Sequence, residues 1–271
     1  MPHMDTGARH AETPLHPVAL VTGAASGIGL AVAQRLSPIA SGGLVLIDKD
    51  GAALEAAADT LPRTPERVST LAMDVADEAR WEQARDFIAT HYGRLDWAVV
   101  NAGVSHAAAI DELSFADWRA VMSVNLDGAF LTMRTVIPFM KRNASGGGIV
   151  ALSSAAGLKA EPGVAAYGAS KAGLLQLVKV AAKEGAAHNV RVNAIAPGGV
   201  ETPMWHSVPM FQDLVRETGS ESAAFLRIAQ EATPLGRYAS ADEVARIVEM
   251  LLADAPSVTG AVMVIDGGYT L

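Results

Sequence analysis

Short hydrophobic runs alternate with longer segments of helical periodicity from Pro17 to the end of the chain. Several of these runs are apolar at successive positions, which is typical of strands that helices cover on both faces. The alternation predicts right-handed crossovers, and therefore an α/β fold with a twisted, mostly parallel seven-stranded sheet. The predicted strands span residues 18–21, 44–47, 69–73, 97–100, 148–152, 190–195 and 261–265.

Helical segments of ordinary length separate these strands. Ser114 and Ser240 each precede an apolar-periodic stretch with acidic residues in its first turn, which predicts a helix N-cap at both positions. The predicted helices span residues 27–36, 50–61, 77–92, 114–140, 164–187 and 240–252.

One segment, residues 198–233, interrupts this rhythm. Pro203, Pro209 and Gly219 stand among apolar residues there, so the segment cannot form a single helix. Long insertions beside the carboxyl ends of strands are commonly lids or binding loops. We therefore expect a substrate lid at about residues 198–233.

The 271 residues are 50% hydrophobic and 18% charged, which predicts a globular protein. This length lies near the upper limit for one hydrophobic core, so a single domain over residues 17–271 is favoured. Residues 1–16 are polar and lack the apolar segment of a secretory signal. We expect a flexible N-terminal extension and a cytoplasmic protein.

The chain contains no cysteine, which excludes disulfides, thiolate metal sites and a cysteine nucleophile. The formal net charge of −8 disfavours nucleic acid and anionic membranes as partners. No uncharged apolar stretch reaches the roughly eighteen residues of a membrane-spanning helix. The seven histidines show no metal-binding spacing, so we expect no metal.

A glycine-rich turn, Thr22-Gly23-Ala24-Ala25-Ser26-Gly27-Ile28-Gly29, follows the first predicted strand and opens a helix. Glycines allow a sharp turn and a close approach to a pyrophosphate, and a helix N-terminus offers free N–H donors. The pattern is typical of a Rossmann-type, doubly wound fold. The cofactor contacts expected in this turn are Gly23, Ser26, Gly27, Ile28 and Gly29.

The second predicted strand runs into Asp48, about 20 residues past the turn, where an acidic residue binds the adenosine ribose in such folds. An Asp accepts hydrogen bonds from the ribose hydroxyls and repels a 2′-phosphate. The sequence therefore predicts NAD, rather than NADP, as the cofactor. Lys49 follows directly and could weaken this preference.

Tyr167 and Lys171 are four residues apart in a predicted helix, so their side chains share one face. Ser153 and Ser154 end a predicted strand thirteen residues before the tyrosine, and open α/β sheets bind ligands at the carboxyl ends of strands. A serine hydroxyl, a phenol and an ammonium that meet there could bind and protonate a carbonyl oxygen.

These motifs together resemble the short-chain dehydrogenase/reductase family, over nearly the whole chain after His16. The other motifs that carry the resemblance are Asp74, Asn101-Ala102-Gly103, Asn125, residues 197–202 and Asp266-Gly267-Gly268. The family likeness implies that Asp74 binds the adenine amine, with Val75 contributing its backbone. It also implies that Asn101, Ala102 and Gly103 border the cofactor. Further cofactor contacts implied by the likeness are Tyr167, Lys171, Pro197, Gly198, Val200 and Thr202, with Thr202 on the nicotinamide carboxamide.

The same resemblance implies a catalytic set of Asn125, Ser154, Tyr167 and Lys171. Tyr167 would take the alcohol proton, Ser154 would orient the oxygen, and Asn125 would hold a water that links Lys171 to solvent. A phenol of pKa ~10 needs ~4 kcal/mol to become a base near neutrality. An ammonium at ~4 Å supplies ~4 kcal/mol at an effective dielectric of ~20. We therefore expect Lys171 and an oxidised nicotinamide to lower the pKa of Tyr167.

Three residues are expected to contact substrate: His106, Met204 and Trp205. Met210 and Phe211 share the irregular segment with Trp205, and the three are expected to form a mobile apolar wall. The sequence favours an oxidoreductase that transfers hydride between NAD and a small-to-medium apolar secondary alcohol or ketone. Two alternatives stay open: a 3-oxoacyl-carrier-protein reductase, and a non-catalytic nucleotide-sensing or scaffold protein. The resemblance also implies a homo-oligomer, a tetramer or dimer, formed through helices 114–140 and 164–187.

Overall fold

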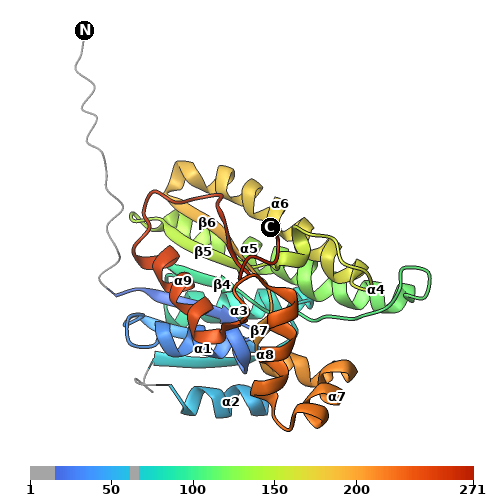
Figure 1. Ribbon diagram of the computed structural model, residues 1–271. Coiled ribbons are helices and arrows are strands. Elements are labelled where there is room, and N and C mark those ends of the chain that lie inside the picture. Colours follow the sequence, from blue (N-terminus) through green and yellow to red (C-terminus); the bar gives the residue numbers. More distant parts are fainter. Residues whose placement is uncertain (1–15, 62–66) are drawn as a thin grey trace.

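The computed structural model describes residues 16–61 and 67–271, so the predicted extension lies outside the described residues except for His16. Seven strands form one sheet in the order β3-β2-β1-β4-β5-β6-β9, and every neighbouring pair is parallel (Figure 1). The Rossmann-type fold predicted from the sequence is confirmed. The strands are β1 (Val18–Thr22), β2 (Gly43–Asp48), β3 (Val68–Ala72), β4 (Trp97–Val100), β5 (Gly147–Leu152), β6 (Val190–Pro197) and β9 (Val262–Ile265).

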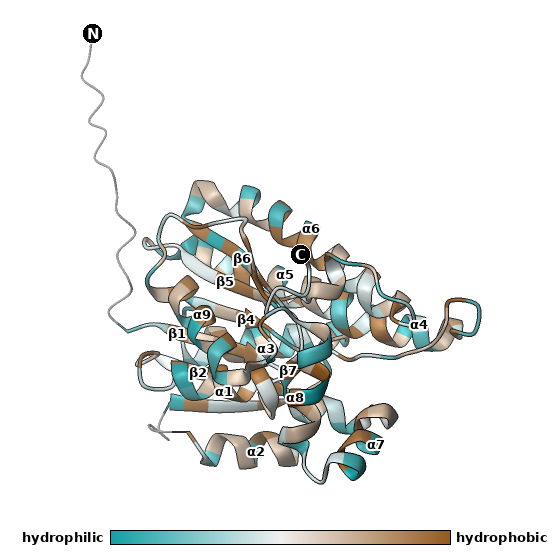
Figure 2. Ribbon diagram, in the orientation of Figure 1, coloured by the Kyte–Doolittle hydropathy of each residue, from teal (hydrophilic) through white to brown (hydrophobic). Residues whose placement is uncertain are grey.

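Each face of the sheet carries its own hydrophobic core, because successive side chains of a strand point to opposite faces. In β1, Val18 and Leu20 belong to the core beneath α3 (Glu78–His91), α5 (Gly128–Arg142) and α6 (Ala165–Gly185). Ala19 and Val21 belong to the opposite core, beneath α1 (Gly27–Leu36), α2 (Gly51–Asp59) and α9 (Ala241–Ala253). Figure 2 shows brown on the central strands and teal on outward faces of the helices.

The predicted helix over residues 114–140 is interrupted. Helix α4 (Phe115–Met122) passes into a π-helical turn, η2 (Ser123–Asp127), before α5 begins. A π turn holds one residue more than an α turn, and such turns are frequent at functional sites. Asn125 lies in this turn and is buried. The sequence periodicity did not reveal the interruption.

The N-caps predicted at Ser114 and Ser240 are confirmed. The Ser114 hydroxyl accepts a hydrogen bond from the Asp117 backbone N–H. Ser240 and Glu243 form a reciprocal capping box at the start of α9. These caps satisfy backbone donors that lack partners within the first helical turn.

Residues 198–233 form several short elements, as their prolines predict. They contain β7 (Val200–Glu201), the 3₁₀ helix η5 (Pro203–Ser207), α7 (Pro209–Thr218) and α8 (Glu221–Ala232). Strand β7 pairs with β8 (Ala239–Ser240), which joins the start of the segment to residues just past its end. A small third core packs this segment against the residue Tyr238 just past its end; its other buried members are Phe211, Ala224, Phe225 and Ala229.

Candidate active site

The loops after β1 and β4 are locked together at the point where the strand order reverses. The Asn101 side-chain amide donates to the backbone oxygens of Thr22, at 3.0 Å, and Gly23, at 3.1 Å. The Thr22 hydroxyl accepts from the backbone N–H groups of Asn101 and Ala102. Thr22 stands in the predicted motif but was not among the predicted site residues. Nucleotides bind at such a switch point in open α/β sheets.

The glycine-rich turn leaves no room for a side chain at Gly29. A Cβ on that residue would lie 1.9 Å from the backbone oxygen of Gly23, so helix α1 reaches the strand only because position 29 is glycine. Ser26 is the N-cap of α1, and its hydroxyl makes no capping hydrogen bond. The first-turn N–H groups, which include those of Gly27 and Ile28, are suited to bind an anion.

Asp48, at the end of β2, turns its carboxylate toward the glycine-rich turn. One oxygen accepts from the Ala25 backbone N–H at 3.1 Å, and the other accepts from Asp50 at 3.2 Å. Lys49 is exposed. The carboxylate thus lies beside the turn, where the sequence analysis expects the adenosine ribose.

Asp74 and Val75 follow β3, at the same carboxyl-end side of the sheet as Asp48. Asp74 is exposed, and its carboxylate accepts from the Ala76 backbone N–H at 2.9 Å. Val75 is buried, and its carbonyl accepts from the Trp81 indole at 2.8 Å. The Val75 carbonyl is therefore already engaged within the fold.

Ser154, Tyr167 and Lys171 come together where β5 ends and α6 begins. The Lys171 ammonium lies 5.7 Å from the centroid of the Tyr167 ring. Burial raises the pKa of Tyr167 above its ordinary 10.0, and a hydrogen bond with the Ser154 side chain lowers it in part. Within the protein alone, burial therefore keeps the phenol protonated at neutral pH, and the decrease expected from Lys171 together with an oxidised nicotinamide stays a prediction.

Lys171 is buried, with 4% of its surface exposed. Its ammonium donates to the Leu152 backbone oxygen at 2.8 Å. Burial lowers the pKa of Lys171 from 10.5 to about 8, because the charged form is poorly solvated. At neutral pH the site therefore contains a buried positive charge beside the tyrosine.

The Asn125 side chain is fully engaged as a donor. Its amide nitrogen donates to the Val104 carbonyl at 2.9 Å and to the Ser170 hydroxyl at 3.0 Å, and its oxygen accepts from the Val104 N–H at 2.8 Å. A Cβ on Gly103 would lie 3.3 Å from both the Asn125 oxygen and the Lys171 ammonium. Asn125 is therefore near Lys171, but only its side-chain oxygen has capacity left to bind a water.

Two serines that were not predicted as site residues also support this set. The Ser153 hydroxyl donates to the Lys171 backbone oxygen at 2.9 Å. The Ser170 hydroxyl donates to the Tyr167 backbone oxygen at 2.7 Å. Their positions next to Ser154 and Lys171 were the only signal for them in the sequence.

The loop after β6 closes the other side of the site. The Gly198 N–H donates to the Ile265 carbonyl at 2.9 Å, and Val200 is buried. Thr202 faces the glycine-rich turn, since a Cβ on Gly27 would lie 3.4 Å from its Cγ2. Pro197 is the last residue of β6. Among the predicted cofactor residues of this loop, Thr202 thus lies against the glycine-rich turn.

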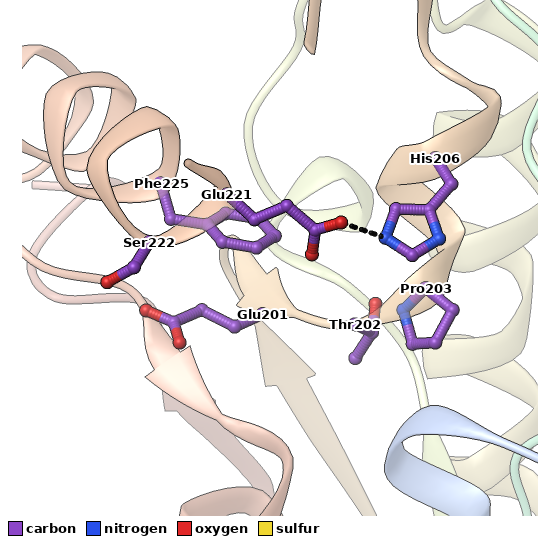
Figure 3. A pocket seen from close by; sticks show the side chains of 7 residues that line it. All are labelled: Glu201, Thr202, Pro203, His206, Glu221, Ser222 and Phe225. Carbon is purple, nitrogen blue, oxygen red and sulfur yellow. Dashed lines mark ion pairs between the residues drawn. The ribbon is translucent and has the colours of Figure 1, made fainter. Parts of the chain in front are cut away.

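A cavity of about 370 Å³ opens beside Thr202. Helix α8 contributes Glu221, which pairs with His206 of η5 at 3.1 Å (Figure 3). The lining of this cavity is mostly polar or charged. It consists of Glu201, Thr202, Pro203, His206, Glu221, Ser222 and Phe225.

The residues expected to touch substrate have different surroundings. Trp205 packs against Phe211, Phe225 and Tyr238, and its indole donates to the Val200 carbonyl at 3.0 Å. Phe211 is only 1% exposed, so the prediction that it forms part of an apolar wall facing substrate is wrong. These rings pack against one another because this contact removes their apolar surface from water.

Met204 and His106, the other two residues expected to touch substrate, are more accessible. Met204, on η5, is half exposed. His106 is exposed and lies 3.8 Å from the Asp117 carboxylate.

Comparison with known proteins identifies the family. A family model described as short chain dehydrogenase matches residues 17–213. The 3-oxoacyl-[acyl-carrier-protein] reductase FabG of Thermotoga maritima is 38% identical over 94% of this chain and 98% of its own length. The D-threitol dehydrogenase of Mycolicibacterium smegmatis is also 38% identical, over 94% of this chain and 93% of its own length.

A solved structure, carveol dehydrogenase from Mycobacterium avium in complex with NAD, has a TM-score of 0.84 and 28% identity. The similarity covers 95% of this chain and 99% of that one. The fold and these similarities define an oxidoreductase of the nicotinamide-dependent α/β class. The chain belongs to the short-chain dehydrogenase/reductase family.

Among residues 16–61 and 67–271, no helix has the length and apolar character needed to cross a membrane. The same residues contain no cluster of three or more His, Asp or Glu side chains placed to bind a metal.

Proposed function

We propose that this chain is an NAD-dependent dehydrogenase that interconverts a small-to-medium apolar secondary alcohol and its ketone. The observation that carries the proposal is the grouping of Ser154, Tyr167 and Lys171 beside a glycine-rich turn closed by Asn101. The bound dinucleotide would supply the acceptor or donor of hydride. A non-catalytic sensor of nucleotides would have no need for this grouping.

The residues present fit a nicotinamide dinucleotide. The first turn of α1 offers N–H donors to the pyrophosphate, and the close packing at Gly29 brings those donors to the end of β1. Asp48 would hold the adenosine ribose hydroxyls. Its negative charge would repel a 2′-phosphate, which supports NAD over NADP. The name of the carveol dehydrogenase structure, which states a complex with NAD, agrees with this choice.

The remaining predicted contacts would surround the other parts of the bound dinucleotide. Asp74 and Val75 would border the adenine, and Asn101, Ala102 and Gly103 would border the ribose. On the other side, Pro197, Gly198, Val200 and Thr202 would border the nicotinamide. Lys171 would bind the second ribose and Tyr167 would lie beside the reacting carbon.

Tyr167 would exchange the proton with the substrate oxygen. In ketone reduction the protonated phenol is the required acid, and burial keeps it protonated. In alcohol oxidation the phenol must first lose its proton. The ammonium of Lys171 and the positive charge of an oxidised nicotinamide would then both favour the phenolate.

Ser154 would orient the substrate oxygen toward Tyr167, because its hydroxyl already pairs with the phenol. Lys171 would return the proton toward solvent through a water near the Asn125 oxygen. Since the pKa of Lys171 is about 8, its ammonium can release and regain a proton near neutrality.

We propose one catalytic domain over residues 17–271, with residues 198–233 as a lid over the substrate. The core residues Phe211, Ala224, Phe225 and Ala229 lie within the lid and would let it move as a unit. Met204 and His106 are the substrate contacts that remain from the sequence analysis. We assign Trp205 to the interior of the lid instead, because its ring packs there.

A second candidate is reduction of a 3-oxoacyl thioester, because the FabG protein of Thermotoga maritima is 38% identical to this chain. Reductases of that kind commonly use NADPH and an acidic carrier protein. Asp48 and the net charge of −8 both oppose this assignment.

The decisive experiment is a panel of secondary alcohols with NAD, followed by absorbance of the reduced nicotinamide. The unmodified protein should oxidise at least one apolar alcohol.

Tyr167→Phe should lower kcat ~10²–10⁴-fold without loss of folding, since it removes only the hydroxyl. Ser154→Ala should lower kcat with NAD affinity nearly unchanged. If NAD bound but no alcohol or ketone reacted, the enzyme assignment would be wrong.

We also propose a homo-oligomer formed through α4, α5 and α6. Phe115 and Phe130 on these helices are exposed, which suits an interface. Light scattering at micromolar concentration should give the mass of a dimer or tetramer, and a monomer mass would contradict the proposal.

A further inference from the structure

The two hydroxyls of the site belong to opposite ends of one loop. Ser154 precedes residues 155–164, here called the connecting loop, and Tyr167 lies in the first turn of α6 directly after it. The start of the loop is held by a 3₁₀ turn, with Gly157 N–H donating to the Ser154 carbonyl at 2.9 Å. Its end is held by the Ala108 N–H, which donates to the Gly163 carbonyl at 2.9 Å.

The middle of the connecting loop contacts Tyr269, more than a hundred residues away in the sequence. The Lys159 ammonium donates to the Tyr269 backbone oxygen at 2.9 Å and lies 4.1 Å from the centroid of its ring. Burial raises the pKa of the Tyr269 phenol, and a hydrogen bond from its hydroxyl to the Glu161 carboxylate raises it further. Tyr269 therefore engages the loop through its backbone, its ring and its hydroxyl.

Tyr269 is itself held in place by the C-terminal segment, residues 266–271. The Asp266 carboxylate accepts from Gly268 N–H at 2.9 Å and from Thr270 N–H at 2.8 Å. The Gly267 carbonyl accepts from Leu235 N–H at 3.0 Å, just past the lid. The segment also follows β9, which pairs with β6. The backbone that carries Tyr269 is therefore held in place by hydrogen bonds on both sides of this residue.

We propose that Tyr269 is a positioning residue for catalysis, which holds the connecting loop and thereby sets the position of Ser154 relative to Tyr167. The inference rests on the proposed function. An unrestrained loop samples many backbone conformations, and ordering it costs conformational entropy. Catalytic groups must be held within ~0.5 Å of their productive geometry, and a misplacement of ~1 Å can cost ~10²-fold in rate.

The kinetic test uses variants that remove the contacts in steps. Tyr269→Ala removes the ring and hydroxyl, and kcat for the alcohol should fall about tenfold. Tyr269→Phe keeps the ring beneath Lys159, so kcat should fall only about threefold. Glu161→Ala removes the partner of the Tyr269 hydroxyl and also a half-exposed ion pair with Lys159 at 3.8 Å, so kcat should fall at least threefold. Glu161→Gln should stay near the unmodified protein, because an amide oxygen still accepts and an exposed ion pair contributes little.

The dissociation constant for NAD should stay within about twofold in all of these variants, because the proposed cofactor residues are unchanged. Leu271→Ala is the matched control, since that side chain lies in the same segment and is fully exposed. A drop in kcat together with weakened NAD binding would indicate general damage to the fold and would overturn the proposal. So would an unchanged kcat in Tyr269→Ala.

Hydrogen exchange provides a second readout that needs no substrate. Amides of residues 155–164 should exchange faster in Tyr269→Ala than in the unmodified protein, and Leu271→Ala should leave them unchanged. Unchanged exchange in Tyr269→Ala would overturn the inference. A chain that oxidises no alcohol but shows the faster exchange would instead count against the proposed function, so the two failures are distinguishable.

Discussion

The buried ammonium of Lys171 donates to the backbone oxygen of Leu152 at 2.8 Å. A charged side chain of α6 is thus hydrogen-bonded to the last residue of β5. The contact places a positive charge where water solvates it poorly, and this lowers the pKa of Lys171 to about 8. The same burial that suits proton transfer near neutrality must therefore cost folding stability.

We predict that Lys171→Met abolishes turnover but removes a pH-dependent cost to folding. The difference between about 8 in the folded protein and the ordinary 10.5 corresponds to about 3 kcal/mol. Below pH 8 both folded and unfolded chains hold the proton, so the folded wild type bears the full cost. As pH rises toward 10.5, the folded state has released the proton while the unfolded state retains it, and wild-type stability increases.

Denaturant unfolding at pH 7 and pH 10 measures this effect. Relative to the wild type, Lys171→Met should be more stable at pH 7 than at pH 10 by about 2–3 kcal/mol. The comparison between two pH values cancels the constant cost of leaving the Leu152 carbonyl without its donor. Lys179→Met removes an exposed lysine of the same helix and should show no such change. Equal relative stabilities at both pH values would disprove the predicted cost.

Cofactor preference should depend on Asp48. Asp48→Ala removes the acceptor beside the glycine-rich turn and the repulsion of a 2′-phosphate. The ratio of kcat/KM for NADP to that for NAD should rise by one or more powers of ten, each worth about 1.4 kcal/mol. Asp59→Ala removes the same charge from an exposed position on α2 and should leave the ratio unchanged. Equal use of both cofactors by the unmodified protein would point to Lys49 instead.

Asn125→Ala should lower both stability and kcat, because three hydrogen bonds link its side chain to Val104 and Ser170. Each bond is worth about 1 kcal/mol. Asn193→Ala is the matched control: this buried amide also bonds to Val258 and Ala261, away from the proposed site. Both variants should unfold at lower denaturant concentration, but only Asn125→Ala should lose kcat at a temperature where both are folded. A similar kcat in the two variants would argue against a role beyond structure.

The sequence was most informative where burial imposes a pattern. The parallel sheet was predictable because its strands are covered on both faces, so runs such as residues 44–47 are apolar throughout. Ser154, Tyr167 and Lys171 were predictable because their spacing and their place after a strand determine where they meet. For Asn101 and Gly23, the sequence indicates only that their two loops lie close together. It does not predict the hydrogen bond between them.

Other features depend on contacts that no local pattern encodes. Phe211 and Met210 are adjacent apolar residues, yet only Phe211 is buried, because Phe225 and Tyr238 fold over it. The increased pKa of Tyr167 depends on the amount of protein around the phenol rather than on its distance from Lys171 along the helix. The contact of Tyr269 with residues 159–161 joins segments that are far apart in the chain.

The π turn at residues 123–127 has a consequence for engineering. It holds one extra residue in an otherwise continuous helix. Each residue of an α-helix rotates the chain about the helix axis by about 100°. If the same residues formed a regular helix instead, the extra residue would turn all of α4 relative to α5 by about that angle. An exchange of this helical region with that of a relative would therefore have to keep the five-residue turn whole.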